Sequence, residues 1–313
     1  MILSEFRSFV KNSLQQIYSS NELDQLAKSL LMSRLKMDST TYLLSSETKV
    51  SDEILVQLRD DVDRLFRHEP LQYVLGCTSF YGLEIQCSPA ALIPRPETEE
   101  LVDWVLSEVQ LPSCALIDLG TGTGCVPLAI KAERPSWVVS AIDVSQEALA
   151  LARSNGFKLN LDVHFEEVDL LQDLSVLSFK DTFNVVVSNP PYIPHTESLS
   201  MLPNVLNHEP HLALFVPDTD PLLFYRRIVA FCEQYLSIDG YVFVEIHEEL
   251  SPEKKWLLTS HEQSGPLELP EIDKSGVRRP SAIRNKLRSR MSQANAEVAP
   301  KVTGKDLNEI EHH

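Results

Sequence analysis

The sequence predicts an α/β protein in which a mostly parallel sheet follows a small N-terminal helical bundle. Before residue 76 the chain contains no glycine, and its apolar residues recur at the spacing of amphipathic helices. From residue 115 onward, short β-branched segments alternate with segments of helical periodicity. Such alternation is typical of a parallel sheet with helices packed on its faces.

The composition limits the class of protein. The chain has 313 residues, 43% of them hydrophobic, which suffices for one large domain and one small one. Its formal net charge of −17 argues against a protein that works by gripping a phosphate backbone. The five cysteines form no C-x-x-C pair, so we expect a reducing compartment. No apolar run approaches membrane-spanning length and no signal peptide is visible, so we expect a cytoplasmic enzyme.

Residues 1–75 are predicted to form the helical bundle. Their apolar residues fall into three sets at helical spacing: Phe6, Val10, Leu14 and Ile17; Leu23, Leu26, Leu30 and Leu31; and Ile54, Leu58, Val62, Leu65 and Phe66. The bundle is either a structural cap or a substrate-docking domain, and the periodicity does not separate these two interpretations.

Residues 76–95 are predicted to be a linker that contains a hairpin. Residues 83–87 alternate between apolar and polar side chains. A helix is expected from Pro96, because proline suits the first helical position and acidic residues suit the first turn. Four residues punctuate the linker: Gly76, Gly82, Pro89 and Pro94.

Residues 96–280 are predicted to form the catalytic domain. Helices are expected from Pro127, from Ser145 and over 222–236. Residues 281–313 are predicted to be a polar, partly disordered tail, with an RNA contact of the basic residues 278–290 as the alternative. The expected strands are 115–119, 138–142, 163–168, 183–187 and 240–246.

A glycine-rich loop follows the first of these strands. Glycines at such a position let a ligand press against the backbone and leave amide groups free to bind it. The G-x-G-x-x-G pattern of dinucleotide sites would need a small residue where Cys125 stands. The observed G-x-G-x-G spacing normally faces the amino-acid part of S-adenosylmethionine. The loop reads Asp118-Leu119-Gly120-Thr121-Gly122-Thr123-Gly124.

Carboxylates end the next two strands. Asp143 lies nineteen positions after the last glycine, where a carboxylate can accept both ribose hydroxyls. Asp169 ends the third strand, where an adenine amino group would lie. Either residue alone would usually be a turn or cap residue. With the loop, they predict the cofactor S-adenosyl-L-methionine, bound by Gly120, Thr121, Gly122, Thr123, Gly124, Asp143, Asp169, Leu170 and Asn189.

The fourth strand ends in a stiff turn. Two consecutive prolines remove two backbone donors and fix two φ angles. At the carboxyl edge of an open α/β sheet, the amide of Asn189 beside the ring of Tyr192 suits a planar substrate with an NH2 group. The predicted catalytic residues are therefore Asn189, Pro190, Pro191 and Tyr192.

No metal site is expected. The stretch His247-Glu248-Glu249 lacks the second histidine of H-E-x-x-H, because position 251 is Ser251. The scattered histidines show no ligand spacing, and no Ser-His-Asp or G-x-S-x-G arrangement stands out.

The motifs resemble those of a known family. The turn N-P-P-Y at 189–192 is a signature of methyltransferases that modify amino groups conjugated to planar systems, including adenine and cytosine in DNA and RNA. Residues 69–76 (E-P-L-Q-Y-V-L-G) and 92–99 (L-I-P-R-P-E-T-E) resemble the release factor glutamine methyltransferase family. The resemblance covers about residues 1–246. Further matching positions are Glu209-Pro210, Ala213-Leu214 and Tyr225-Arg226.

This resemblance implies a class I S-adenosylmethionine-dependent methyltransferase fold, with a Rossmann-like, mostly parallel sheet. It implies methyl transfer to the glutamine of the Gly-Gly-Gln motif of bacterial peptide chain release factors, and hence a role in translation termination. Release factors are then the expected partners, docked in part by residues 1–75. We expect no direct nucleic-acid binding, no membrane contact and a monomer.

The chain departs from the family pattern in two places. After Ala213-Leu214 the family usually has a Gly-Gly-x-Asp-Gly turn, whereas residues 215–221 read F-V-P-D-T-D-P. Beyond Ile246 the match fades, apart from a faint similarity of residues 273–279 to the family's closing hairpin. The sequence beyond Ile246 therefore does not indicate which residues form the last strands of the sheet.

The expected mechanism depends on placement of a poor nucleophile. We expect the Asn189 side-chain oxygen and the Pro190 carbonyl to accept the two protons of the substrate amide. Tyr192 is expected to pack against the amide plane, and Pro191 to keep the turn rigid. Two other functions are weighed: a nucleic-acid amino-methyltransferase acting on a flipped base, and an idle protein that uses the fold as a docking platform.

Overall fold

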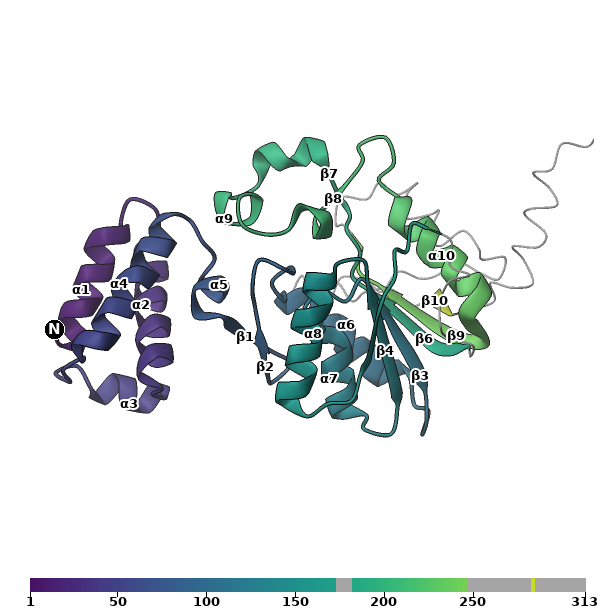
Figure 1. Cartoon of the computed structure of the whole chain (residues 1–313), viewed down its shortest axis with the longest axis horizontal. Helices are drawn as coiled ribbons and strands as arrows, with labels where there is room; N and C mark the ends of the chain where they lie inside the picture. The colour runs from purple at the N-terminus through teal and green to yellow at the C-terminus, as the bar shows by residue number, and fades with distance from the viewer. Residues whose placement is uncertain (173–181, 247–282, 285–313) are drawn as a thin grey trace, which may run out of the picture.

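The computed structural model describes residues 1–172, 182–246 and 283–284 (Figure 1). Most of the periodic apolar residues of the N-terminal region form one core, but Ile17 is not part of it and Phe66 is 55% exposed. In the described ranges, none of the helices combines the length and apolarity needed to span a bilayer. The N-terminal helices are α1 (Leu3–Leu14), α2 (Ser20–Leu35), α3 (Ser39–Leu44), α4 (Asp52–Phe66) and α5 (Leu71–Leu75).

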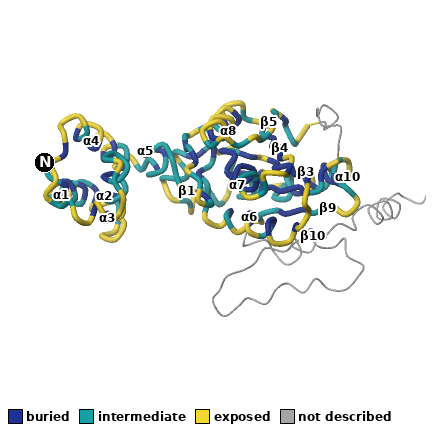
Figure 2. The backbone as a smooth tube through the Cα atoms, turned by 90° about the horizontal axis from the view of Figure 1, so that it is seen from below, coloured by how far each residue is buried: buried dark blue, intermediate teal, exposed yellow. Residues whose placement is uncertain are grey.

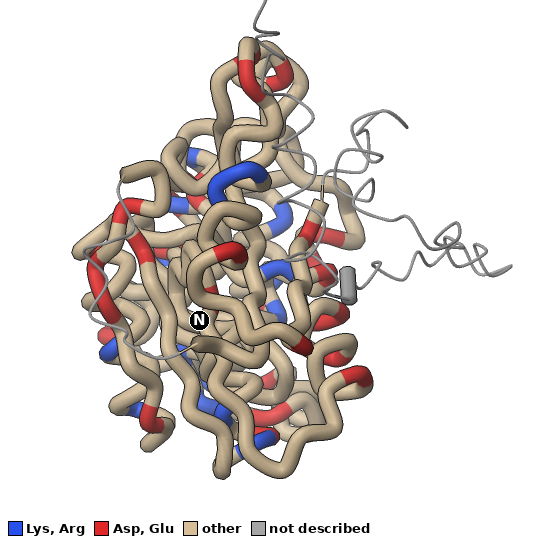
Figure 3. The backbone as a smooth tube through the Cα atoms, turned by 90° about the vertical axis from the view of Figure 1, so that its right-hand side faces the viewer, with Lys and Arg blue, Asp and Glu red and all other residues tan. Residues whose placement is uncertain are grey.

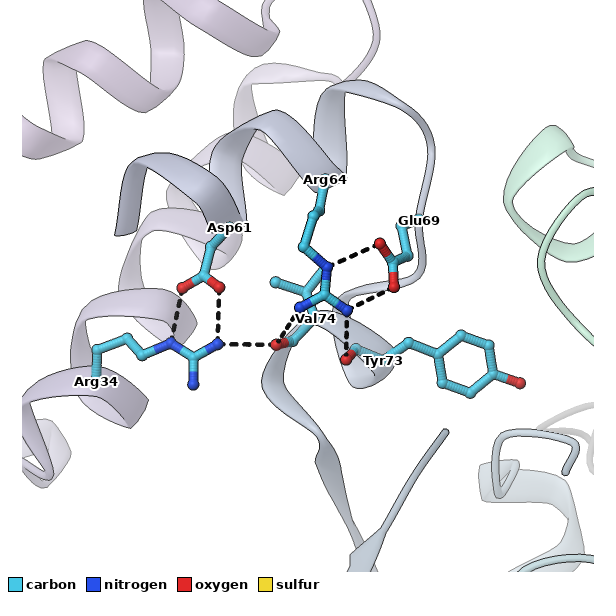
Figure 4. Close-up of polar contacts among 6 residues, drawn as sticks. All are labelled: Arg34, Asp61, Arg64, Glu69, Tyr73 and Val74. Atoms are coloured by element: carbon cyan, nitrogen blue, oxygen red, sulfur yellow. Dashed lines mark hydrogen bonds and ion pairs between the residues drawn. The ribbon is translucent and has the colours of Figure 1, made fainter. Parts of the chain in front are cut away.

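Two arginines hold the short helix α5 against the bundle (Figure 4). Arg34 of α2 donates to the carbonyl of Val74 (2.8 Å). Arg64 of α4 donates to the carbonyls of Tyr73 (3.0 Å) and Val74 (3.2 Å). Carbonyls at the end of a helix lack partners within it, so these cations cap α5 where the chain leaves the bundle. Both guanidinium groups are also ion-paired, as Arg34–Asp61 and Arg64–Glu69.

The predicted hairpin connects the bundle to the sheet. It consists of β1 (Cys77–Phe80) and β2 (Leu83–Gln86), which pair antiparallel. Its turn is anchored on α6 (Pro96–Glu108): the amide of Tyr81 donates to Glu99 (2.9 Å) and its hydroxyl donates to Asp103 (2.5 Å). The helix expected from Pro96 is confirmed, and the hairpin holds it in place.

The central sheet of the described chain has the strand order β10-β9-β6-β3-β4-β5. Its pairs are parallel except β10 with β9, which confirms the predicted mostly parallel sheet. The strand order reverses on either side of β3, which creates a ligand crevice at the carboxyl ends of the strands. The strands are β3 (Ala115–Leu119), β4 (Val138–Asp143), β5 (His164–Glu167), β6 (Phe183–Ser188), β9 (Leu236–Val244) and β10 (Ile283–Arg284).

Helices cover both faces of this sheet. Leu116 of β3 and Val185 of β6 face a core shared with α6 and α7. Their neighbours Ile117 and Val186 face the opposite core, shared with α10. The strands are therefore buried on both faces, and Figure 2 shows them as the dark centre of this part of the molecule. The helices of this region are α7 (Cys125–Glu133), α8 (Gln146–Leu159) and α10 (Leu223–Tyr235).

Two strand predictions need correction. Strand β9 begins before the expected Gly240, because Phe183 pairs with Leu236 while Val185 pairs with Tyr241. The intervening residues form an irregularity that has no periodic signature in the sequence. Strand β10 lies in the segment predicted as a polar tail, where backbone pairing of two residues leaves no pattern to detect. Predictions on residues 247–282 and 285–313 lie outside the described residues.

Candidate active site

A cavity lies at the carboxyl ends of β3, β4 and β6, where the strand order reverses. It is bordered by the segment 90–95, which precedes α6, and by Pro210, Leu212 and Ala213. Gly124 and Tyr192 are not among its lining residues. The other predicted site residues all line it: Gly120, Thr121, Gly122, Thr123, Asp143, Asp169, Leu170, Asn189, Pro190 and Pro191.

The glycine loop is tied to the end of β4. The amides of Gly120 and Thr121 both donate to the carbonyl of Ile142 (2.9 and 3.0 Å). Gly122 has a φ of +55°, which other residues rarely adopt, and its amide donates to Asp143 Oδ2 (2.8 Å). The loop and the carboxylate therefore form one rigid unit.

Gly124 has a packing role. Its φ is +79°, and it is the N-cap of α7. An added Cβ would lie 3.1 Å from the Cβ of Ala152 in α8 and 3.3 Å from Leu128 Cδ1. We therefore interpret Gly124 as the residue that allows α7 and α8 to approach, rather than as a cofactor contact.

The carboxylate of Asp143 has capacity for a further ligand. Its two oxygens accept the amides of Gly122 (2.8 Å) and Ser145 (2.9 Å). Burial raises its pKa, and these amide hydrogen bonds act in the opposite direction. Each oxygen has a second lone pair, so the carboxylate can also accept two hydroxyl groups. Asp169 similarly accepts the amide of Leu171 with Oδ1 (2.9 Å).

Buried polar groups beside the loop fit a polar cofactor. The hydroxyl oxygens of Thr121 and Thr123 are buried and have no hydrogen-bond partner among the described residues. Asp118 is buried at the end of β3, and burial raises its pKa to about 7; the nearby Thr121 hydroxyl opposes this shift and Asp143 adds to it. A buried donor or acceptor that makes no hydrogen bond lowers the stability of the folded state by about 1–3 kcal/mol. The amino and hydroxyl groups of S-adenosylmethionine match this set of donors and acceptors.

A chain of hydrogen bonds holds Asn189. Its Nδ2 donates to Thr98 Oγ1 (3.1 Å), and the Thr98 hydroxyl donates to Glu245 Oε2 (3.0 Å). Burial raises the pKa of Glu245, and the hydrogen bonds from Thr98 and Tyr192 oppose that shift. The nitrogen end of the Asn189 amide is thus engaged, and its oxygen end is left to accept from a ligand.

Tyr192 contacts the same carboxylate. Its hydroxyl donates to Glu245 Oε1 (3.3 Å), and burial, followed by the charge of Glu245, raises the pKa of the phenol. Tyr192 therefore anchors the C-terminal end of the turn that carries Asn189.

An ion pair with a buried carboxylate joins the segments on either side of the cavity. The side chain of Glu209, 1% exposed, accepts from Arg95 Nη2 (2.5 Å) and from the amide of Ile93 (3.2 Å). The hydroxyl of Tyr73, in α5, donates to the carbonyl of Ala91 (2.8 Å). Tyr73 also packs with Ile93, so the family-like segments 69–76, 92–99 and 209–210 are in direct contact.

The loop that departs from the family pattern is fixed by side chains. Strand β7 (Ile193–Pro194) pairs in parallel with β8 (Phe215–Val216). Asp218 accepts from the amide (2.9 Å) and the hydroxyl (3.0 Å) of Thr196. These contacts close the loop without a glycine turn. Between the two strands lie η2 (His195–Ser200), α9 (Pro203–Leu206) and η3 (His211–Ala213).

Three residues of this site were missing from the sequence prediction. Thr98 lies in a segment interpreted as a capped helix start, and Asp118 stands in the quoted loop sequence but was not among the predicted binding residues. Glu245 follows β9, and its only signal was a carboxylate at the carboxyl end of a parallel strand. Ligands of open α/β sheets bind at the carboxyl ends of the strands. Considering every carboxylate near the carboxyl end of a predicted strand would therefore have found both Asp118 and Glu245.

Family models match both parts of the chain. The model described as Methyltransferase small domain matches residues 101–210, and the model described as PrmC N-terminal domain matches residues 5–76. The parallel sheet, the glycine loop and the carboxylates at the strand ends agree with the first of these. The chain is a class I S-adenosylmethionine-dependent methyltransferase.

Curated relatives narrow this class. The release factor glutamine methyltransferase of Flavobacterium psychrophilum is 36% identical over 265 residues, which are 83% of this chain and 92% of the relative. The enzymes of that name from Bacteroides thetaiotaomicron and Streptococcus pneumoniae are also 36% identical. They cover 79% and 77% of this chain, and 87% and 83% of their own length. The chain belongs to the release factor glutamine methyltransferase family.

Proposed function

We propose that the protein transfers a methyl group from S-adenosylmethionine to the side-chain amide nitrogen of the glutamine in the Gly-Gly-Gln motif of peptide chain release factors. By this modification it tunes translation termination. Membership of the family supports the substrate class. The observation that carries the chemistry is the engaged nitrogen of Asn189, since it leaves the side-chain oxygen free to accept from an amide NH2 group.

The cofactor is assigned to the cavity beside the glycine loop. Backbone amides of the loop would hold its amino-acid part, Asp143 its ribose hydroxyls, and Asp169 with Leu170 its adenine. When bound, S-adenosylmethionine supplies an electrophilic sulfonium methyl group. Thr121, Thr123 and Asp118 would complete their hydrogen bonds with it, because they line the same cavity.

The turn at 189–192 is assigned to the substrate amide. A carboxamide nitrogen is a poor nucleophile because its lone pair is delocalised into the carbonyl group. Acceptance of its two protons by Asn189 Oδ1 and the Pro190 carbonyl would fix the nitrogen and raise its electron density. Orientation of this kind can supply about 7–11 kcal/mol of a barrier. Pro191 keeps the turn rigid. Tyr192, which was expected to pack against the amide plane, does not line the cavity and is instead proposed to hold the turn through Glu245. The proton released after transfer can leave to water.

The N-terminal helices, residues 1–75, are proposed as part of the docking surface for the release factor. Residues 76–95 would connect this unit to the methyltransferase domain at 96–280. We propose a monomer that works in the cytoplasm, where release factors act. Acidic residues outnumber basic ones by 45 to 28. In the view of Figure 3, positions of Lys and Arg are interspersed with positions of Asp and Glu along the backbone. This charge pattern supports a protein substrate rather than a nucleic acid.

One labelling experiment tests the function. Purified protein is incubated with methyl-labelled S-adenosylmethionine and, in separate reactions, with a release factor, with its Gly-Gly-Ala variant and with DNA. We expect label only in the intact release factor. Label in DNA, or in none of the three substrates, would contradict the proposal.

A further inference from the structure

We infer that Thr98 and Glu245 are positioning residues that hold the Asn189 amide in the orientation presenting its oxygen to the substrate. The inference rests on the proposed function, because it concerns how the glutamine amide is bound. Both residues lie outside the turn that carries Asn189, on α6 and after β9.

An asparagine side chain presents two different ends. A half-turn of its last torsion angle exchanges the oxygen and the nitrogen with little change of shape. Only one orientation suits a substrate NH2 group, because the oxygen accepts its proton, whereas the nitrogen would oppose one donor with another. The protein therefore needs a group that distinguishes the two ends of Asn189.

Glu245 makes that distinction through Thr98. A hydroxyl alone is ambiguous, because it can both donate and accept. An ionised carboxylate only accepts, so the Thr98 proton is committed to Glu245 Oε2 (3.0 Å). Thr98 Oγ1 is left to accept, and it does so from Asn189 Nδ2 (3.1 Å). The carboxylate thus fixes the orientation of the Thr98 hydroxyl, and the hydroxyl in turn fixes the orientation of the Asn189 amide.

The backbone holds this chain of contacts in place. The amide of Glu245 donates to the carbonyl of Ser188 (3.0 Å), the residue before Asn189. The hydroxyl of Tyr225 donates to the Glu245 carbonyl (3.4 Å), and Thr98 is 2% exposed, so water has little access to its hydroxyl. Within the described ranges no Lys or Arg forms an ion pair with Glu245. Removing a carboxylate from water without a cation beside it is costly even when the group is only partly buried, and such groups concentrate at functional sites.

A matched pair of substitutions tests the role of Thr98. Thr98→Val keeps the shape and removes the hydroxyl, and we expect kcat on the release factor to fall about tenfold or more. The Kd of S-adenosylmethionine and the KM of the release factor should stay within about twofold, because the proposed cofactor contacts and docking surface are unchanged and the Asn189 contact acts mainly in the transition state. Thr98→Ser should restore most of kcat. Ser107→Ala, which removes an exposed hydroxyl from the same helix, is the control.

A double-mutant cycle separates positioning from general damage. If Thr98 acts through Asn189, then Thr98→Val should cause no further loss in an Asn189→Ala background. A wild-type kcat in Thr98→Val would overturn the inference. So would a double variant in which Thr98→Val lowers kcat by the same factor as it does in the wild-type background. Should Thr98→Val fail to fold, Glu245→Gln is measured instead in the same cycle. A wild-type protein that leaves the release factor unmethylated would refute the proposed function itself, which is a separate outcome.

Discussion

We assign one half of the cavity to the cofactor and the other to the substrate, and this cofactor half and substrate half are constructed differently. In the cofactor half, the glycine loop and Asp143 follow adjacent parallel strands, and backbone amides bind the carboxylate. In the substrate half, Asn189 depends on Thr98, 91 residues earlier, which in turn depends on Glu245, 147 residues further along the chain. One half is local and built on the backbone, and the other is a long-range chain of side chains.

This difference assigns separate effects to the two halves. Substitutions in the cofactor half should change cofactor affinity, because its groups bind the cofactor in the ground state. Substitutions in the substrate half should change kcat, because its contacts strengthen as charge develops on the substrate nitrogen. The following predictions test that separation, starting with the largest expected effect.

Asn189→Ala removes the acceptor for one amide proton. We expect kcat to fall about 10²–10³-fold, as for the loss of one polar group that binds developing charge. Cofactor affinity should change far less. Steady-state kinetics with the release factor and calorimetry with S-adenosylmethionine measure the two effects. Asn207→Ala, at an exposed position in the same region, is the control. Near-normal turnover of Asn189→Ala would end the assignment of the substrate half.

Asp143→Asn preserves the shape of the side chain and removes its charge. Hydrogen bonds to a charged group contribute about 1.5–3 kcal/mol, so we expect the Kd of S-adenosylmethionine to rise about tenfold to a hundredfold. At saturating cofactor, kcat should stay close to that of the wild type. Asp162→Asn, at an exposed position, should leave the Kd unchanged. A large loss of kcat at an unchanged Kd would remove the distinction between the two halves.

Gly124→Ala tests the packing role within the cofactor half. The positive φ and the 3.1 Å approach to Ala152 predict a loss of about 1–3 kcal/mol in the free energy of unfolding. Gly82 also has a positive φ (+75°), but an added Cβ would meet nothing within 4 Å. Gly82→Ala should therefore destabilise less in urea titrations. Equal losses in the two variants would show that the backbone conformation, and not the contact with α8, sets the requirement at Gly124.

The smallest expected effect concerns the pH dependence of stability. Burial raises the pKa of Glu245 in the folded state, so the folded protein binds this proton more tightly than the unfolded chain does. Wild-type stability should therefore fall, through this group, as pH rises from the unfolded pKa to the folded pKa. Glu245→Gln lacks this titration, so its Tm relative to the wild type should increase over that interval. A constant difference in Tm would show that the carboxylate is not destabilised by burial.

The same contrast explains what the sequence could predict. The glycine loop, Asp143 and the N-P-P-Y turn are runs of adjacent residues at strand ends, so their type and spacing indicated their place. The partnership of Thr98 with Glu245 has no local signature, because only the packing of α6 against the end of β9 brings them together. The early start of β9 and the two-residue strand β10 were missed for a related reason, since irregular or short backbone pairing leaves no periodicity.

Locating the methyl group on the substrate tests the account most directly. The release factor is treated with S-adenosylmethionine and either wild-type protein or Asn189→Ala, and its peptides are sequenced by tandem mass spectrometry. We predict a single methyl group on the glutamine of Gly-Gly-Gln with the wild-type protein, and little or none with the variant over the same time. A methyl group on any other residue, or equal modification by both proteins, would contradict the assignment of the Asn189 amide to the substrate glutamine.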